Sequence, residues 1–172
     1  DQTGREFLKR RYRNYPWTNI LRYTGAGNTA SSTIKETTSA DASTGGLIDT
    51  VREVQIWLNQ TYSAGLSTDG LYGTFTKRAL TKALQRCVGV DADGIFGAMT
   101  YAACRKLDLA KGMTGEAVKI LQAFLVCNGY KAAYVDGDFG SGTERALKAY
   151  QGSHGLAADG IAAQATFKSF CS

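Results

Sequence analysis

One phrase recurs along this chain and constrains its fold more than any other feature. It reads Asp-Gly-x-aromatic-Gly-x-x-Thr-x-x-Ala in three copies, and a fourth copy keeps Asp, Gly and Thr. The copies begin at Asp69, Asp93, Asp136 and Asp159. The first and second copies are 24 residues apart and the third and fourth 23, whereas the two pairs are offset by 67 and 66 residues. The repeating unit is therefore a pair of phrases, and the pair occurs twice.

Segments with helical periodicity precede and follow these phrases. Apolar residues recur every three or four positions in 51–61 and 116–130, ahead of each pair, and again in 79–84 and 146–150, between the phrases. We expect the second phrase of each pair to open a short third helix, near 98–106 and 164–170. We therefore predict an all-α fold in which each unit of about 60 residues reads helix, turn, helix, turn, helix.

The chemistry of the phrase is that of a turn. Glycine after aspartate accepts positive φ, and the aspartate carboxylate can accept hydrogen bonds from nearby backbone N–H groups. We expect the aromatic residue (Tyr72, Phe96 or Phe139) to enter the core, and the next glycine to let the backbone turn into a helix. Ser141 and Glu144 fit a capping box at the start of that helix.

The stretch 135–150 also suggests a cation loop, because Asp136, Asp138 and Glu144 lie among glycines. An EF-hand loop places glycine sixth and glutamate twelfth, but counting from Asp136 these places hold Ser141 and Leu147. We therefore interpret the acidic residues as turn and cap residues and predict no metal and no cofactor.

The four cysteines, Cys87, Cys104, Cys127 and Cys171, form no C-x-x-C pair, and the single histidine, His154, argues against a zinc finger. An even number of cysteines is compatible with two disulfides in an oxidising compartment or with buried free thiols. No apolar run approaches the roughly 20 residues needed to cross a bilayer, so we expect no membrane insertion.

The net charge of +5 is concentrated at the start of the chain. Residues 1–23 carry six cationic side chains against two acidic ones and contain a helix-like stretch, and residues 24–46 form a Gly/Ser/Thr-rich linker. Such a basic segment is typical of a solvated helix face, and it can also bind nucleic acid or another polyanion. We keep polyanion binding as an alternative function and do not expect nucleic acid to be the partner.

The doubled unit resembles the type-1 family of peptidoglycan-binding domains over roughly 46–171. The second copy matches the family pattern at Val118, Leu121, Gln122, Leu125, Gly129, Tyr130, Asp136, Gly137, Phe139, Gly140, Thr143, Ala146, Tyr150, Gln151, Gly155, Leu156, Asp159, Gly160, Ile161 and Thr166. The first copy matches at Val51, Gln55, Leu58, Asp69, Gly70, Tyr72, Gly73, Thr76, Ala79, Asp93, Gly94, Ile95, Gly97 and Thr100. It departs at 59–62, where the family has Gly-Tyr, and the second copy departs at Ala162 and Ala163.

The resemblance implies two tandem three-helix bundles, 47–107 and 108–172, that bind the bacterial cell wall beside an enzyme that cuts or remodels it. Candidate ligand-binding residues are Trp57, Tyr62, Tyr72, Tyr130, Tyr134 and Asp136, with core burial as the alternative for the aromatic ones. Two copies on one chain would raise a weak affinity for the polymer. If each unit is compact, the cysteines would pair as Cys87–Cys104 and Cys127–Cys171, with one disulfide in each unit.

The first residues loosely resemble the end of sporulation stage II protein D-like domains, through Gln2, Gly4, Trp17, Ile20, Leu21 and Tyr23. That resemblance implies a glycan-cleaving domain upstream, so the chain would be the C-terminal part of a peptidoglycan hydrolase or lytic transglycosylase. We predict no catalytic residue within this chain, because one histidine excludes two-histidine zinc hydrolases. We expect a secreted, monomeric, wall-located protein of bacterial or phage origin, with an inhibitory propeptide as a further alternative.

Overall fold

The computed structural model describes residues 50–132 and 134–172, and the predicted N-terminal segment and linker lie outside them. The described residues fold into α2 (Val51–Tyr62), α3 (Thr74–Val88), α4 (Ala98–Ala103), the 3-10 helix η3 (Cys104–Lys106), α5 (Glu116–Cys127), α6 (Ser141–Ser153) and α7 (Gln164–Cys171). Within them β-structure is limited to two isolated bridges, Leu109 with Ala162 and Thr114 with Asp138. The predicted all-α fold and its helix order are confirmed. Among the same residues, no helix combines the length and apolarity needed to span a membrane.

The helix ends follow from local sequence. At the start of α2, the Thr50 hydroxyl accepts from the Glu53 backbone N–H at 3.3 Å and the Glu53 carboxylate accepts from the Thr50 N–H at 3.1 Å. This is a capping box, which satisfies backbone donors that the helix leaves free. The helix α3 ends at Gly89, whose φ of +76° suits glycine, and the next residue, Val90, donates back to the Gln85 carbonyl.

The predicted capping box at Ser141 and Glu144 is wrong. The residue before α6 is Gly140, no side chain in the described part of the chain caps this helix, and Ser141 already lies in its first turn. The Glu144 carboxylate instead accepts from Lys148 at 2.9 Å and forms an ion pair with Lys111 at 3.3 Å.

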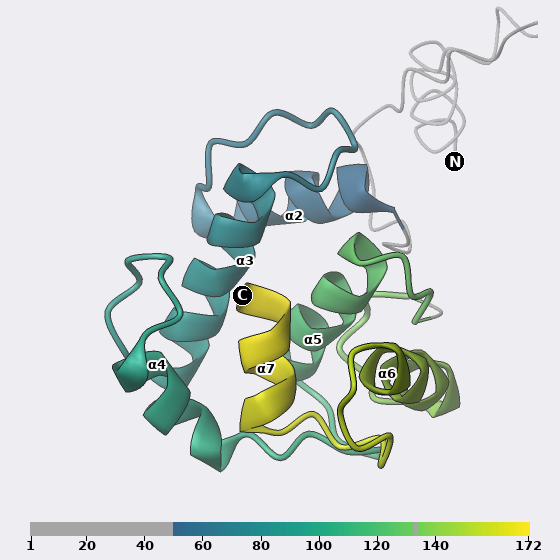
Figure 1. Cartoon of the computed structure of the whole chain (residues 1–172). Helices are drawn as coiled ribbons and strands as arrows, with labels where there is room; N and C mark the ends of the chain where they lie inside the picture. Colours follow the sequence, from purple (N-terminus) through teal and green to yellow (C-terminus); the bar gives the residue numbers. More distant parts are fainter. Residues whose placement is uncertain (1–49, 133) are drawn as a thin grey trace, which may run out of the picture. The chain divides into compact units, whose positions relative to one another are not determined.

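The two repeats pack against one another around one continuous core. The central helices α3 and α5 are in contact, α2 also packs on α5, and buried residues from both repeats form a single cluster. In Figure 1 the yellow helix α7 lies beside the teal helix α3 and the green helix α5, although these segments are far apart in the sequence. The boundaries predicted for the repeats, 47–107 and 108–172, remain a prediction.

Helix α7 joins the repeats through specific side chains. Phe170 stacks on Tyr150 of α6 and on Phe124 of α5, with ring centroids 4.1 and 5.1 Å apart. On its other side, the Lys168 ammonium lies 5.7 Å from the ring centroid of Tyr101 in α4. The last helix of the second repeat is thus fixed to both repeats.

The predicted disulfides are absent, because all four cysteines are free thiols. Cys171, expected to pair with Cys127 inside the second repeat, lies against the first repeat, where its Sγ accepts from the Thr81 hydroxyl at 3.4 Å. In the first repeat, Cys87 is exposed whereas Cys104 is fully buried.

Thiol labelling tests this arrangement. Burial raises the pKa of the Cys104 and Cys127 thiols to about 12, and the thiolate is the reactive form. We therefore expect a maleimide to modify Cys87 in the folded protein and to reach Cys104 and Cys127 only after denaturation, as followed by peptide mass spectrometry. A denatured, non-reduced sample with no free thiol, carrying Cys87–Cys104 and Cys127–Cys171 crosslinks, would contradict the structure and restore the disulfide prediction.

Candidate functional site

Each of the four repeated phrases forms a corner held by a glutamine from the preceding helix. The four glutamine side chains are each only 1% exposed. They lie 14 residues before the first phrase of each pair and eight before the second. The sets of glutamine, aspartate, glycine and threonine are Gln55–Asp69–Gly70–Thr76, Gln85–Asp93–Gly94–Thr100, Gln122–Asp136–Gly137–Thr143 and Gln151–Asp159–Gly160–Thr166.

The same hydrogen bonds recur at every corner. At the first, the Gln55 amide donates to Asp69 Oδ1 at 2.9 Å, to the carbonyl of the residue two places after Asp69 at 3.0 Å, and to Thr76 Oγ1 at 3.1 Å. Its own Oε1 accepts from the Gly70 N–H at 2.9 Å. The corresponding bonds at the other three corners are 2.7 to 3.4 Å long. One buried amide therefore bonds to the carboxylate, carbonyl, hydroxyl and N–H groups that define the turn.

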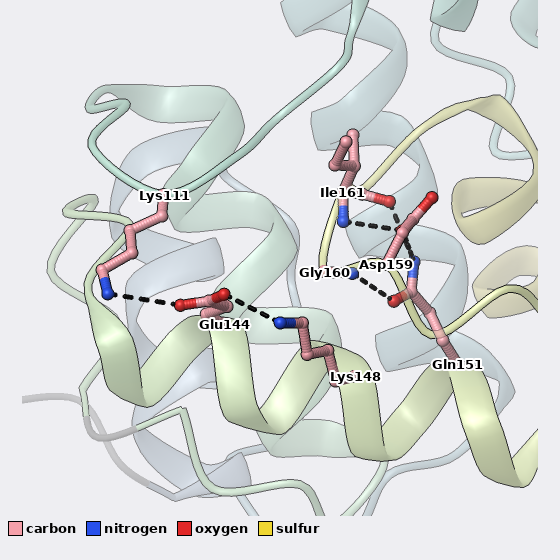
Figure 2. A network of polar contacts seen from close by, with 7 residues as sticks. All are labelled: Lys111, Glu144, Lys148, Gln151, Asp159, Gly160 and Ile161. Carbon is pink, nitrogen blue, oxygen red and sulfur yellow. Dashed lines mark hydrogen bonds and ion pairs between the residues drawn. The ribbon is translucent and has the colours of Figure 1, made fainter.

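Figure 2 shows the fourth corner, where Gln151 reaches Asp159, Gly160 and Ile161. The Asp159 carboxylate accepts from the Ile161 N–H at 2.9 Å, which is the turn geometry expected of aspartate. In the same view Glu144 lies between Lys111 and Lys148, away from the corner carboxylate.

The contacts of the acidic loops show that their aspartates bond to the backbone and side chains of the turn. In the stretch that suggested a metal, Asp136 Oδ1 accepts from Gln122 at 2.9 Å and from the Asp138 N–H at 2.8 Å. Within residues 50–132 and 134–172, no group of three or more His, Cys, Asp or Glu side chains is arranged to hold a metal ion. The predicted role of the aspartates as turn residues is confirmed.

Glycine is required at one of its two places in the phrase. The glycine after aspartate has φ between +76° and +86° at all four corners, which favours glycine strongly. The second glycine has an ordinary extended conformation, and Ala163 adopts the same one at the fourth corner, with φ −96° and ψ −177°. The expectation that this second glycine enables the turn into the helix is therefore wrong.

A groove lies beside the first corner, between the loop that joins α2 to α3 and the outer face of α3. Its volume is about 730 Å³. Asn59 fixes the loop, because its side chain donates to the Leu66 carbonyl at 2.8 Å and accepts from the Leu66 N–H at 2.7 Å. The groove lining includes Tyr62, Leu71, Phe75, Arg78, Lys82 and Arg86.

The α3 side of the groove carries a row of three cations. Arg78, Lys82 and Arg86 follow one another at four-residue spacing, so they lie on one face of the helix, about 6 Å apart along its axis. The Arg78 guanidinium donates to the Asp93 carbonyl at 3.2 and 3.3 Å, and Arg86 donates to the Tyr62 carbonyl at 3.3 Å. A guanidinium has five N–H donors, so each arginine keeps donors for a ligand.

Apolar side chains stand exposed next to these cations. Leu71 is 70% exposed and Phe75 is 81% exposed, and both line the groove. The corresponding residues of the second corner, Ile95 and Met99, are 63% and 76% exposed. Large apolar side chains exposed together often mark an interaction surface.

The structure places the predicted ligand-binding residues in different environments. Trp57 is 6% exposed, and the Tyr72 hydroxyl is buried without a hydrogen-bond partner among the residues that the structure describes, so their rings serve packing. Tyr130 packs edge-on against Tyr150, with centroids 5.4 Å apart. Asp136 is engaged at its corner, Tyr134 is 40% exposed, and Tyr62 lines the groove.

Tyr62 is the predicted residue that the structure brings into the groove. Burial and a hydrogen bond to the Glu116 carboxylate raise the pKa of its hydroxyl, so it stays protonated at neutral pH. The Arg86 guanidinium lies 5.7 Å from its ring centroid. The cation row was missed in the sequence, although its four-residue spacing is visible there.

Comparison with known proteins identifies the family to which the two repeats belong. The family model described as "Putative peptidoglycan binding domain" matches residues 49–103 and 114–169. The chain therefore belongs to this family of peptidoglycan-binding domains, in two tandem copies. The resemblance to sporulation domains lies in residues 1–23, outside the described part of the chain.

Two relatives match shorter stretches. The zinc D-Ala-D-Ala carboxypeptidase of Streptomyces albus G is 44% identical over 63 residues, 34% of this chain and 24% of the relative. The N-acetylmuramoyl-L-alanine amidase CwlM of Mycobacterium tuberculosis is 47% identical over 55 residues, 32% of this chain and 14% of the relative. The match thus spans less than a quarter of either enzyme. No solved structure gives a significant match.

A pair of glutamine substitutions in α2 tests the corner. Gln55→Ala removes the donor and acceptor that bond to four polar groups of the first corner, and we expect it to lower the free energy of unfolding by about 2–4 kcal/mol. Gln60→Ala changes an exposed residue of the same type in the same helix, and we expect less than about 0.5 kcal/mol. Urea denaturation measures both, and equal losses would contradict the role assigned to Gln55.

The lowered pKa values of two corner aspartates predict how the stability of the protein changes with pH. The pKa of Asp69 and of Asp93 is lowered, first by the backbone N–H two residues on and then by the glutamine amide. Their stabilisation is therefore complete above the unfolded pKa of about 3.9 and is lost as pH falls through the lower folded value. We expect Asp93→Asn, which keeps an acceptor oxygen at the turn, to lose less stability than the unaltered chain between pH 7 and pH 3. Urea midpoints at both pH values measure this, and equal losses would contradict it.

Proposed function

We propose that this chain is a non-catalytic peptidoglycan-binding module that targets or anchors a wall-degrading or wall-remodelling enzyme. The observation that carries the proposal is the family match to both repeats. The groove of the first repeat, with its exposed apolar and cationic side chains, supplies a surface where a wall polymer can bind.

The relatives support the proposed attachment to an enzyme. One is named as a carboxypeptidase and the other as an amidase, and each is several times longer than the stretch it shares with this chain. We therefore place the catalytic groups of the parent protein outside the described residues. The reaction of the attached domain stays open between a peptidoglycan hydrolase and a lytic transglycosylase, and its setting would be extracellular or within the cell wall.

The packing of the two repeats also affects how the module would bind a polymer. The two repeats share one core, so their outer surfaces are held in a fixed relative orientation. Any gain in affinity from having two copies would then depend on this orientation.

Sedimentation with insoluble sacculi tests the proposal. We expect the full chain to sediment with purified sacculi, to leave them uncut as judged by turbidity and released muropeptides, and to stay in solution with cellulose. A variant with Arg10, Arg11 and Arg13 changed to glutamine should still sediment. Failure of the unaltered chain to sediment would overturn the proposal, and loss of binding only in the variant would favour the polyanion alternative.

A further inference from the structure

We propose that the groove of the first repeat is a binding site for the stem peptide of peptidoglycan, and that it binds the peptide through its free carboxylates. This inference rests on the proposed function and adds the chemical part of the wall that is bound. It commits to the peptide because the groove matches a short, extended, anionic chain in charge, length and apolar contact.

Charge is the first reason. The groove is lined by Arg78, Lys82 and Arg86 against one carboxylate, that of Asp69. This carboxylate is engaged at the corner, where it accepts from Gln55 and from the Leu71 N–H, both at 2.9 Å. Among the described residues, the ion pairs are those of Glu144 with Lys111 and Lys148, and none of the three cations takes part in one. The row therefore has positive charge available for an anionic ligand.

The donors of the row are oriented before any ligand arrives. Arg78 is tied to the Asp93 carbonyl and Arg86 to the Tyr62 carbonyl, so both ends of the row are fixed. Lys82 lies between them and is half-buried against the second corner. Side chains that are already ordered lose less entropy when they bind. A guanidinium can bind a carboxylate through two parallel hydrogen bonds, and this favours carboxylates over neutral sugar hydroxyls.

Length and apolar contact agree with a peptide. Arg78 and Arg86 are eight positions apart, which corresponds to about 12 Å along the helix, and an extended peptide covers this distance in about four residues. Leu71 and Phe75 offer exposed apolar surface at the end of the groove nearest Arg78. The methyl groups of alanine residues in a stem peptide would contact this surface while the carboxylates meet the cations.

The second repeat lacks this combination. Aligned from the corner aspartates, Asp138 and Gly142 stand where the first repeat has Leu71 and Phe75. Aligned from the corner glutamines, the counterpart of Lys82 is Lys148, which is paired with Glu144 at 2.9 Å. Its ion pair is visible in Figure 2. We therefore assign peptide binding to the first repeat.

Charge reversal at one position in each repeat tests the inference. Both Lys82→Glu and Arg145→Glu replace a cation on a helix with an anion, and Arg145 is exposed on α6. Binding of the full chain to a purified stem tetrapeptide would be measured by calorimetry, with circular dichroism to confirm that each variant is folded. We expect Lys82→Glu to weaken binding at least tenfold and Arg145→Glu to change it less than twofold. Lys82→Ala should give an intermediate loss.

The choice of ligand separates failure of the inference from failure of the proposed function. We expect an amidated tetrapeptide, without free carboxylates, and peptide-free glycan strands to bind at least tenfold more weakly than the free peptide. If Lys82→Glu still sediments with sacculi like the unaltered chain, or if glycan strands alone bind tightly, the inference is overturned and the wall-binding function stands. If sacculi stripped of teichoic acid no longer bind, the anion is a polymer phosphate and the inference is also overturned. If intact sacculi do not bind the unaltered chain, the proposed function itself fails.

Discussion

The buried glutamine amide is the interaction on which the rest of this structure depends. Each glutamine belongs to the helix before a corner, and its bonds end on the residues that start the next helix. Within residues 50–132 and 134–172, no side chain caps the helices that follow the corners, because the residues before them are Gly73, Gly97, Gly140 and Ala163. The direction in which each helix leaves its corner is therefore set by a side chain from the previous helix.

The spacing between the corner threonine and the next corner glutamine differs by one residue between the repeats, and this changes which face of the helix is left for packing against the other repeat. In α3, Gln85 follows the corner threonine Thr76 by nine residues, whereas in α6 Gln151 follows Thr143 by eight. One residue corresponds to about 100° around a helix. Relative to the corner threonine, the glutamine that holds the next corner therefore lies on a different side of α3 than of α6. The buried Thr81 of α3 faces Cys171 of α7. The face of α3 that carries Thr81 is thus covered by the last helix of the other repeat.

The helices and turns could be predicted from sequence because both depend on local patterns. Apolar periodicity identified α2, α3, α5 and α6, the second phrase of each pair identified the start of α4 and of α7, and Asp-Gly identified the corners, since positive φ and aspartate turns involve adjacent residues. The capping box failed because the partners of Glu144 include Lys111, which no local pattern connects to it. The disulfides failed because pairing within each repeat assumed two separate cores. The glutamines were matched as family positions at Gln55, Gln122 and Gln151, but their role required knowledge of which residues meet in space.

The corner network also explains how one scaffold can carry two different surfaces. Aspartate, glycine, threonine and the preceding glutamine all make inward hydrogen bonds, so these residue types are constrained at every corner. The residues two and six places after each aspartate make no side-chain hydrogen bond in this network, so their side chains are free to differ. At the first of these positions stand Leu71, Ile95, Asp138 and Ile161, and at the second Phe75, Met99, Gly142 and Ala165. Both corners of the first repeat therefore display two large apolar side chains each, whereas at these positions the second repeat keeps the same turns with Ile161 as its one large apolar side chain. A duplicated fold of this type can change its ligand-facing chemistry in one copy without altering the hydrogen bonds that hold either copy together.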